Sequence, residues 1–333
     1  FLRNDKLDGT NFFANAQGAD KPSLRRNQLG ATIGGPIAKN KVFYFVSWQS
    51  TYARLGQSFT STVPTLAARI GDFSGEPDPN RQVFDPLTNP GGTREVVPDF
   101  VVPASRFDPV SAGIVELYPN PTGSGTRNTF FFSPSDRINS HQYDFKWDYN
   151  INDNHRTFIR YSIRDEDVLN NCPMPLPACG GTGQTVDLPG HNWAASLQST
   201  FGANMFTELR FGFAHFPTRF DIPFTENLNS QFGIKGAPGD TIGDGLDHGM
   251  TLFIPGSGIT NVGPRAFWPN VNKLDNLQLS NNLTIIQGRH TYKFGYEYRR
   301  TDVPRSPSRF RRGQFNFNGQ CMAAVSYTHL TLP

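Results

Sequence analysis

One segment of the sequence has the residue types of a calcium site. The glycine-rich run at residues 239–248 contains three carboxylates and an imidazole: Asp240, Asp244, Asp247 and His248. Calcium binds clustered oxygen atoms on flexible backbone, so the three aspartates are candidate ligands. Their spacing matches no EF-hand, and acidic glycine-rich loops are usually only solvated. We interpret the run as a solvated loop and keep calcium binding as the alternative.

Two cysteines are close enough in sequence to react with each other. Cys172 and Cys179 end the string CPMPLPAC, which contains no His, Asp or Glu. A structural metal site needs about four ligands, so the string does not indicate one. At a cell surface we favour a disulfide that closes this proline-rich loop, with a pair of free thiols as the alternative. Cys321 is assigned no role.

Motifs for catalysis or nucleotide binding are absent from the sequence. It has no Gly-x-Ser-x-Gly and no His-Glu-x-x-His, and its glycine-rich runs lack the strand-to-helix context of a phosphate loop. The 31 Lys+Arg against 28 Asp+Glu give a formal net charge of only +3. The basic residues form no dense patch, so no nucleic-acid partner is expected. The sequence predicts neither an enzyme nor a cofactor.

A further set of charged residues is organised by strict alternation. Between residues 141 and 150, aromatic residues occupy odd positions and polar residues even positions. Side chains of a strand alternate between two faces, whereas a helix of about 3.6 residues per turn would mix the sets. After a polar break at residues 151–154 the period returns, with Phe158 out of place, so the runs predict a hairpin. Its polar face, expected to line a lumen, holds Asp144, Lys146, Asp148, Arg156, Arg160 and Arg164.

Three more segments follow the same plan, which makes four hairpins and eight strands. Their short turns lie near residues 38–40, 202–204 and 287–289. A ninth strand is expected to begin near Gly313, with Phe315 and Phe317. The connections between hairpins are long and span roughly residues 55–139, 165–190 and 217–272. Soluble domains rarely contain unstructured loops beyond about 12–15 residues.

The alternation of short turns and long connections indicates the class of β protein. Outer-membrane barrels have short periplasmic turns, long external loops and strands of about 10 residues that alternate in polarity. Such strands keep the mean hydropathy low, here −0.46. We therefore predict an all-β fold, an antiparallel transmembrane barrel in a Gram-negative outer membrane, with outer-membrane lipid as a partner. A soluble β protein whose aromatic residues fill a core is the alternative.

The N-terminal part of the sequence resembles a known family. Residues 26–37, RNQLGATIGGPI, followed by NKVFYF at residues 40–45, are similar to the start of the barrel in Oar-like TonB-dependent receptors. Leu29 and Ala31 stand where that family more often has Phe and Gly. Two further segments resemble its plug-to-barrel junction and its first long external loop: residues 8–15, and residues 102–109 with the helix-like run 110–118.

The resemblance covers about residues 5–320 and implies part of a larger barrel. The family has about 22 strands, of which eight to nine would lie here, and an N-terminal plug. It implies energised uptake of a scarce, unidentified small substrate, with the protein's own plug and the TonB complex as partners. The implied division is a plug-to-barrel junction at residues 1–25, the partial barrel at 26–320, and a non-native tail at 321–333 that resembles translated adaptor sequence.

Other function classes stay open on the sequence alone. An outer-membrane or cell-surface β protein could use the same loops for adhesion or a structural role, and an upstream plug would distinguish it from a receptor. A secreted enzyme on a β scaffold is a third class, for which no catalytic motif is found. The lumen-facing charges are expected to hold a plug or hydrate the interior rather than bind one specific ligand.

Overall fold

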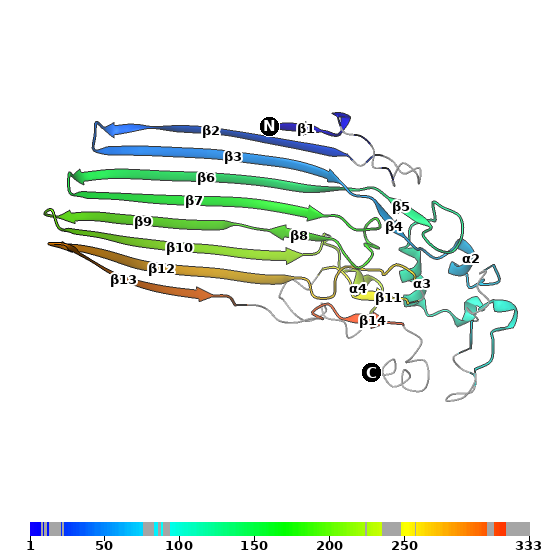
Figure 1. Cartoon of the computed structure of the whole chain (residues 1–333). Helices are drawn as coiled ribbons and strands as arrows, with labels where there is room; N and C mark the ends of the chain where they lie inside the picture. Colours follow the sequence, from blue (N-terminus) through cyan, green and yellow to red (C-terminus); the bar gives the residue numbers. More distant parts are fainter. Residues whose placement is uncertain are drawn as a thin grey trace.

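One large antiparallel sheet dominates the computed structural model, as Figure 1 shows. The structure describes residues 1–7, 9, 12, 21, 23–75, 83–85, 88, 94–223, 225–234, 248–256, 258–304 and 310–317. The strand order is β1-β2-β3-β6-β7-β8-β10-β12-β13, and β9 pairs with β7 and β10. Long strands therefore lie beside their neighbours in sequence, as in an up-and-down barrel.

Eight strands of 12–18 residues form most of the sheet. They are β2 (Leu24–Ala38), β3 (Val42–Gly56), β6 (Ser135–Asn152), β7 (His155–Asn170), β9 (Gly190–Phe201), β10 (Met205–Asp221), β12 (Asn270–Gln287) and β13 (His290–Asp302). Their pairing confirms the four hairpins expected from the sequence. A tilted strand crosses a bilayer with about 9–11 residues, so these strands are long enough to span it.

The short strand β8 (Gln184–Asp187) continues the line of β9. Both pair with β7 in a single register, in which Asp167 is opposite Asp187 and Arg164 is opposite Gly190. The interruption falls at residues 188–189, where Pro189 has no N–H to donate to the ladder. At the other edge, β1 (Leu2–Asn4) pairs with β2 and precedes the 3-10 helix η1 (Asp5–Leu7).

The hairpin turns all lie at one end of the sheet. Figure 1 shows the four turns at the left and the connections between hairpins at the right. The turn after β12 consists of Gly288 and Arg289, and Gly288 has φ +61°. Glycine reaches this left-handed region without the steric cost that a Cβ would bring. The short turns and long connections therefore lie at opposite ends, as the sequence predicted.

The register gives the sheet one apolar and one polar face. A row of mutually paired residues on one face runs from β3 to β13: Tyr44, Trp147, Ile159, Ala195, Phe211, Leu279 and Tyr298. The next row, on the opposite face, consists of Phe45, Lys146, Arg160, Ala194, Gly212, Gln278 and Arg299. In the first row Trp147 is 43% and Phe211 41% exposed. An uncovered apolar face opposite a polar one is typical of transmembrane barrel strands.

The connections at the far end are folded rather than extended. We call them the outer cap: the described parts of residues 57–134, 171–183 and 222–269, together with 310–317. The cap contains β4 (Phe59–Ser61), α2 (Leu66–Arg69), η2 (Pro98–Phe100), η3 (Ala104–Arg106), α3 (Pro109–Glu116), β5 (Phe130–Phe132), α4 (Leu228–Gln231), β11 (Leu252–Ile254) and β14 (Gln314–Asn316). Figure 1 shows these elements beyond the ends of the long strands.

Most of the buried apolar side chains lie in the outer cap. Val63 of the first connection, Met174 of the second and Met250 of the third belong to one cluster and are each at most 1% exposed. Burial of apolar surface drives packing, and among the described residues of the eight long strands only Ala53 is a buried hydrophobic residue. The long connections thus carry a hydrophobic core of their own, which the sequence analysis did not anticipate.

The helix-like run at residues 110–118 corresponds to α3. Its N-cap is Asp108, whose carboxylate accepts a hydrogen bond of 2.8 Å from the backbone N of Ser111, and Pro109 occupies the first turn. Both are favourable at a helix start, because a capping oxygen satisfies a free N–H and proline needs none. No helix in the described part of the chain is long and apolar enough to span a membrane.

A strand does begin near Gly313, as the sequence predicted, but it is not part of the large sheet, so its assignment to the barrel is wrong. β14 has three residues and pairs in parallel with β11 in the cap. The ring of Phe253 in β11 stacks on Phe315 at 5.1 Å between centroids and on Phe317 at 6.5 Å. The alternating aromatic residues therefore pack against the cap core, which the local period alone could not distinguish from a barrel strand.

Candidate functional site

The polar face of the sheet brings together the charged residues chosen from the sequence. The register places six of them on one face of neighbouring strands: Asp144, Lys146 and Asp148 of β6, and Arg156, Arg160 and Arg164 of β7. Lys146 lies opposite Arg160, and Asp144 lies opposite Ser162, whose hydroxyl donates a hydrogen bond of 2.5 Å to it. The polar face of β6 and β7 therefore carries six charged side chains close together.

Several charges on this face are paired along their own strand. Three pairs, with the distance between nitrogen and oxygen, are Lys146–Asp148 at 2.7 Å, Arg210–Glu208 at 2.7 Å and Arg299–Glu297 at 2.9 Å. The partners are two residues apart, and alternate residues of a strand share a face. The cationic side chains are 39–60% exposed, so such pairs contribute little to stability. Each of these pairs is neutral and leaves its side chains hydrated.

Two cations of β7 form a strip without acidic partners. Within the described ranges, Arg156 and Arg160 are in no ion pair, and both are exposed. They lie on either side of Phe158, the residue that breaks the alternation in the sequence. The ammonium of Lys146 lies 5.4 Å from the centroid of the Phe158 ring, within the range of a cation–π contact. This strip leaves unpaired positive charge exposed on the polar face of the sheet.

A chain of polar contacts crosses the apolar face near its cap end. The hydroxyl of Tyr161 and Nδ1 of His191 are 2.8 Å apart, the rings of His191 and His215 stack at 6.3 Å, and Nδ1 of His215 bonds the carboxylate of Asp275. Four strands, β7, β9, β10 and β12, each contribute one side chain. The register places His191, His215 and Asp275 in one row, with Tyr161 diagonal to His191, and no local sequence pattern indicates this arrangement.

Cys172 and Cys179 are joined by a disulfide in the outer cap. Both cysteines are buried in the cluster that contains Met174. Gly183 has φ +77°, and a Cβ at this position would lie 2.3 Å from Sγ of Cys172. Glycine is therefore required where the chain passes the sulfur atoms. The bridge closes a short loop within the second connection, and this loop is packed in the cap core.

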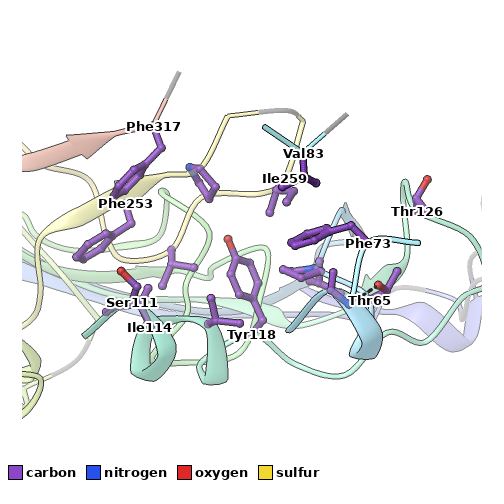
Figure 2. Close-up of a pocket in the computed structure, with 16 residues that line it drawn as sticks. Thr65, Phe73, Val83, Ser111, Ile114, Tyr118, Thr126, Phe253, Ile259 and Phe317 are labelled. Atoms are coloured by element: carbon purple, nitrogen blue, oxygen red, sulfur yellow. Dashed lines mark hydrogen bonds between the residues drawn. The ribbon is translucent and has the colours of Figure 1, made fainter. Parts of the chain in front are cut away.

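A pocket of about 630 Å³ opens in the outer cap between the first and third connections (Figure 2). Its lining is mainly apolar, and the first connection contributes Ile114, Val115 and Tyr118 from α3 and the turn after it. Figure 2 shows Phe253 and Phe317 on one side of the pocket, with α3 below Tyr118. This pocket was not predicted from the sequence, although the apolar run at residues 250–254 within a long connection indicates a core there.

Tyr118 and Arg69 hold one wall of the pocket. The hydroxyl of Tyr118 donates a hydrogen bond of 2.6 Å to the carbonyl oxygen of Thr260. Burial raises the pKa of the Tyr118 phenol, and the charge of Arg69 partly opposes this. Arg69 donates to the carbonyl oxygens of Tyr118 at 2.8 Å and Pro119 at 2.5 Å, and burial lowers the pKa of its guanidinium. The wall is therefore fixed by hydrogen bonds as well as by packing.

Some residues chosen from the sequence lie outside the described residues. These are the calcium candidates Asp240, Asp244 and Asp247, together with Cys321 and the rest of the tail. Among the residues that the structure does describe, no group of three or more His, Cys, Asp or Glu is placed to hold a metal ion.

Two solved structures are similar to the chain at low identity. The outer membrane transporter YddB from Escherichia coli has a TM-score of 0.48 at 9% identity, over 91% of this chain and 30% of that one. The siderophore receptor PiuA from Acinetobacter baumannii has a TM-score of 0.20 at 10% identity, over 85% and 44%. The chain thus spans less than half of either protein. Both TM-scores lie below 0.5, so the assignment below does not rest on them.

A family model assigns the chain directly. No curated protein matches it. The model described as "Outer membrane beta barrel domain" matches residues 1–330, which is nearly the whole sequence. This agrees with the long antiparallel sheet and its two unlike faces. The chain therefore belongs to the outer membrane beta-barrel domain family and is a β-barrel protein of the bacterial outer membrane.

Proposed function

We propose that the chain forms part of the wall of an Oar-like TonB-dependent receptor, which takes up a scarce small substrate across the outer membrane. The observation that carries the proposal is the polar face of the sheet, with Arg156 and Arg160 in no ion pair within the described ranges. A hydrated face with free positive charge suits a barrel interior that encloses an acidic plug surface or passes a solute. The apolar face would contact lipid.

The open edge of the sheet supports a barrel larger than eight strands. β13 pairs with β12 on one side only, and all of its 13 residues are exposed. A long strand with an unpaired edge is not stable in a membrane, because its N–H and C=O groups need partners. Further strands would supply them, as in the barrel of about 22 strands that the resemblance implies.

Capture of TonB tests this proposal. The complete gene product, purified in detergent from outer membranes, should be retained by an immobilised periplasmic domain of TonB. A porin from the same membranes serves as the control and should not be retained. If the folded protein passes through the column like the porin, energised transport is excluded. Adhesion or a structural role, which the folded outer cap would serve, then becomes the better interpretation.

A further inference from the structure

We propose that the pocket of the outer cap binds a neutral, mainly apolar small molecule that arrives from outside the cell. This binding does not depend on how, or whether, the barrel is energised. The short hairpin turns lie at the other end of the sheet, so the cap stands on the side of the long connections. In outer-membrane barrels the long connections are external. A ligand in the surrounding medium therefore reaches the pocket without crossing the membrane.

The lining of the pocket selects against charge. Among the described residues, no side chain that lines the pocket is charged near neutral pH. An ion placed there would lose its hydration without gaining a partner, which is costly. The nearby cation, Arg69, already donates to backbone carbonyl oxygens. A neutral ligand meets neither obstacle.

The polar atoms of the lining leave few hydrogen bonds for a ligand. The hydroxyl of Tyr118 donates to Thr260, and the hydroxyl of Thr65 accepts a hydrogen bond of 3.1 Å from the backbone N of Ala68. The hydroxyls of Ser111 and Thr126 remain at the pocket. The ligand is thus expected to be held mainly by apolar contact and oriented by one or two hydrogen bonds.

The pocket is formed before a ligand binds. Val63, Ile114 and Val262 line it and also belong to the buried cluster of the cap, with exposures of 1%, 6% and 0%. Its volume of about 630 Å³ lies in the range of small-molecule sites, about 300–1,000 Å³. Walls that are already packed need no ordering on binding, which favours affinity.

Photo-crosslinking with a neutral aryl diazirine tests the site. The complete gene product, folded in detergent, is irradiated with 3-phenyl-3-(trifluoromethyl)diazirine, and the labelled peptides are mapped by mass spectrometry. We expect labelling of residues 63–73 and 111–118 that falls by at least about fivefold in excess naphthalene. Mapping separates the pocket from detergent-exposed strands, whose labelling excess naphthalene should not displace.

Two substitutions on one helix provide the matched comparison. Ala68 lines the pocket, whereas Ala67, its neighbour in α2, is exposed and does not. Ala68→Phe should fill the space and lower the displaceable label by at least about fivefold, and Ala67→Phe should leave it unchanged. Ser111→Leu, at the opposite wall, should also lower it. The proposal would be overturned if naphthalene did not displace the label in the cap. It would also be overturned if the displaceable label were equal in Ala67→Phe, Ala68→Phe and Ser111→Leu. Either result would also be seen if another part of the protein filled the pocket. TonB capture is unaffected by either result.

Discussion

The phenol oxygen of Tyr118 and the carbonyl oxygen of Thr260 lie 2.6 Å apart, although the two residues are 142 positions apart in the sequence. This hydrogen bond joins the first connection of the outer cap to the third, beside the pocket. Tyr118 is 4% exposed, and its own carbonyl oxygen accepts a hydrogen bond from Arg69. Both ends of the residue are therefore held, and the pocket depends on contacts that only the folded cap provides.

Tyr118→Phe should loosen the outer cap without affecting the barrel. The substitution removes one buried hydrogen bond, which costs about 1 kcal/mol. Backbone amides at residues 111–118 and 258–264 should then exchange hydrogen about fivefold faster. Tyr143→Phe, on the exposed apolar face of β6, is the control and should leave exchange in the cap unchanged. Equal exchange in the wild type and Tyr118→Phe would show that the hydrogen bond does not support the cap.

The stability of the cap should fall at high pH. Burial raises the pKa of the Tyr118 phenol above its usual value of 10.0, so the folded cap keeps a proton that the unfolded chain loses. The contribution is fully present below about pH 10 and declines as the pH rises above it. Proteolysis of the cap should accelerate from pH 9 to pH 11, and less so in Tyr118→Phe. The same acceleration in both proteins would contradict this assignment.

Loss of the disulfide should destabilise the second connection of the cap. Cys172 and Cys179 are seven positions apart, and closing so short a loop contributes roughly 2 kcal/mol in the chain-entropy model. The double substitution Cys172→Ala/Cys179→Ala should increase protease cleavage within residues 171–183. Cys321→Ala changes a cysteine without touching the bridge and should cleave as the wild type does. Unchanged cleavage in the double variant would mean that packing around Met174 suffices.

Arginine should be tolerated on only one face of β7. Ile159→Arg places a cation on the apolar face, which in barrels costs about 2–4 kcal/mol near the middle of the bilayer. Ser162→Arg, three residues further along the same strand, adds the same side chain to the polar face and should cost much less. The measurement is the fraction of the complete protein that assembles into the outer membrane. Equal assembly of the two variants would refute the assignment of the faces.

The sequence by itself determined the pairing of neighbouring strands and the two faces of the sheet. In residues 141–164 the alternation of aromatic and polar residues specifies which side chains share a face, because the period of two is a local property of a strand. The charged residues of the polar face, from Asp144 to Arg164, were found for the same reason. The short turns at residues 202–204 and 288–289 follow from local residue types as well.

Only the tertiary structure showed that the long connections pack into an outer cap with a pocket, and that the last aromatic residues belong to this cap. Phe315 and Phe317 alternate like a barrel strand, yet they stack on Phe253 because β11 presents a free edge to them. Tyr118 meets Thr260 because three connections pack into one core. Such contacts join segments far apart in the chain, and their choice depends on which apolar surfaces fit together, a property that no local period encodes.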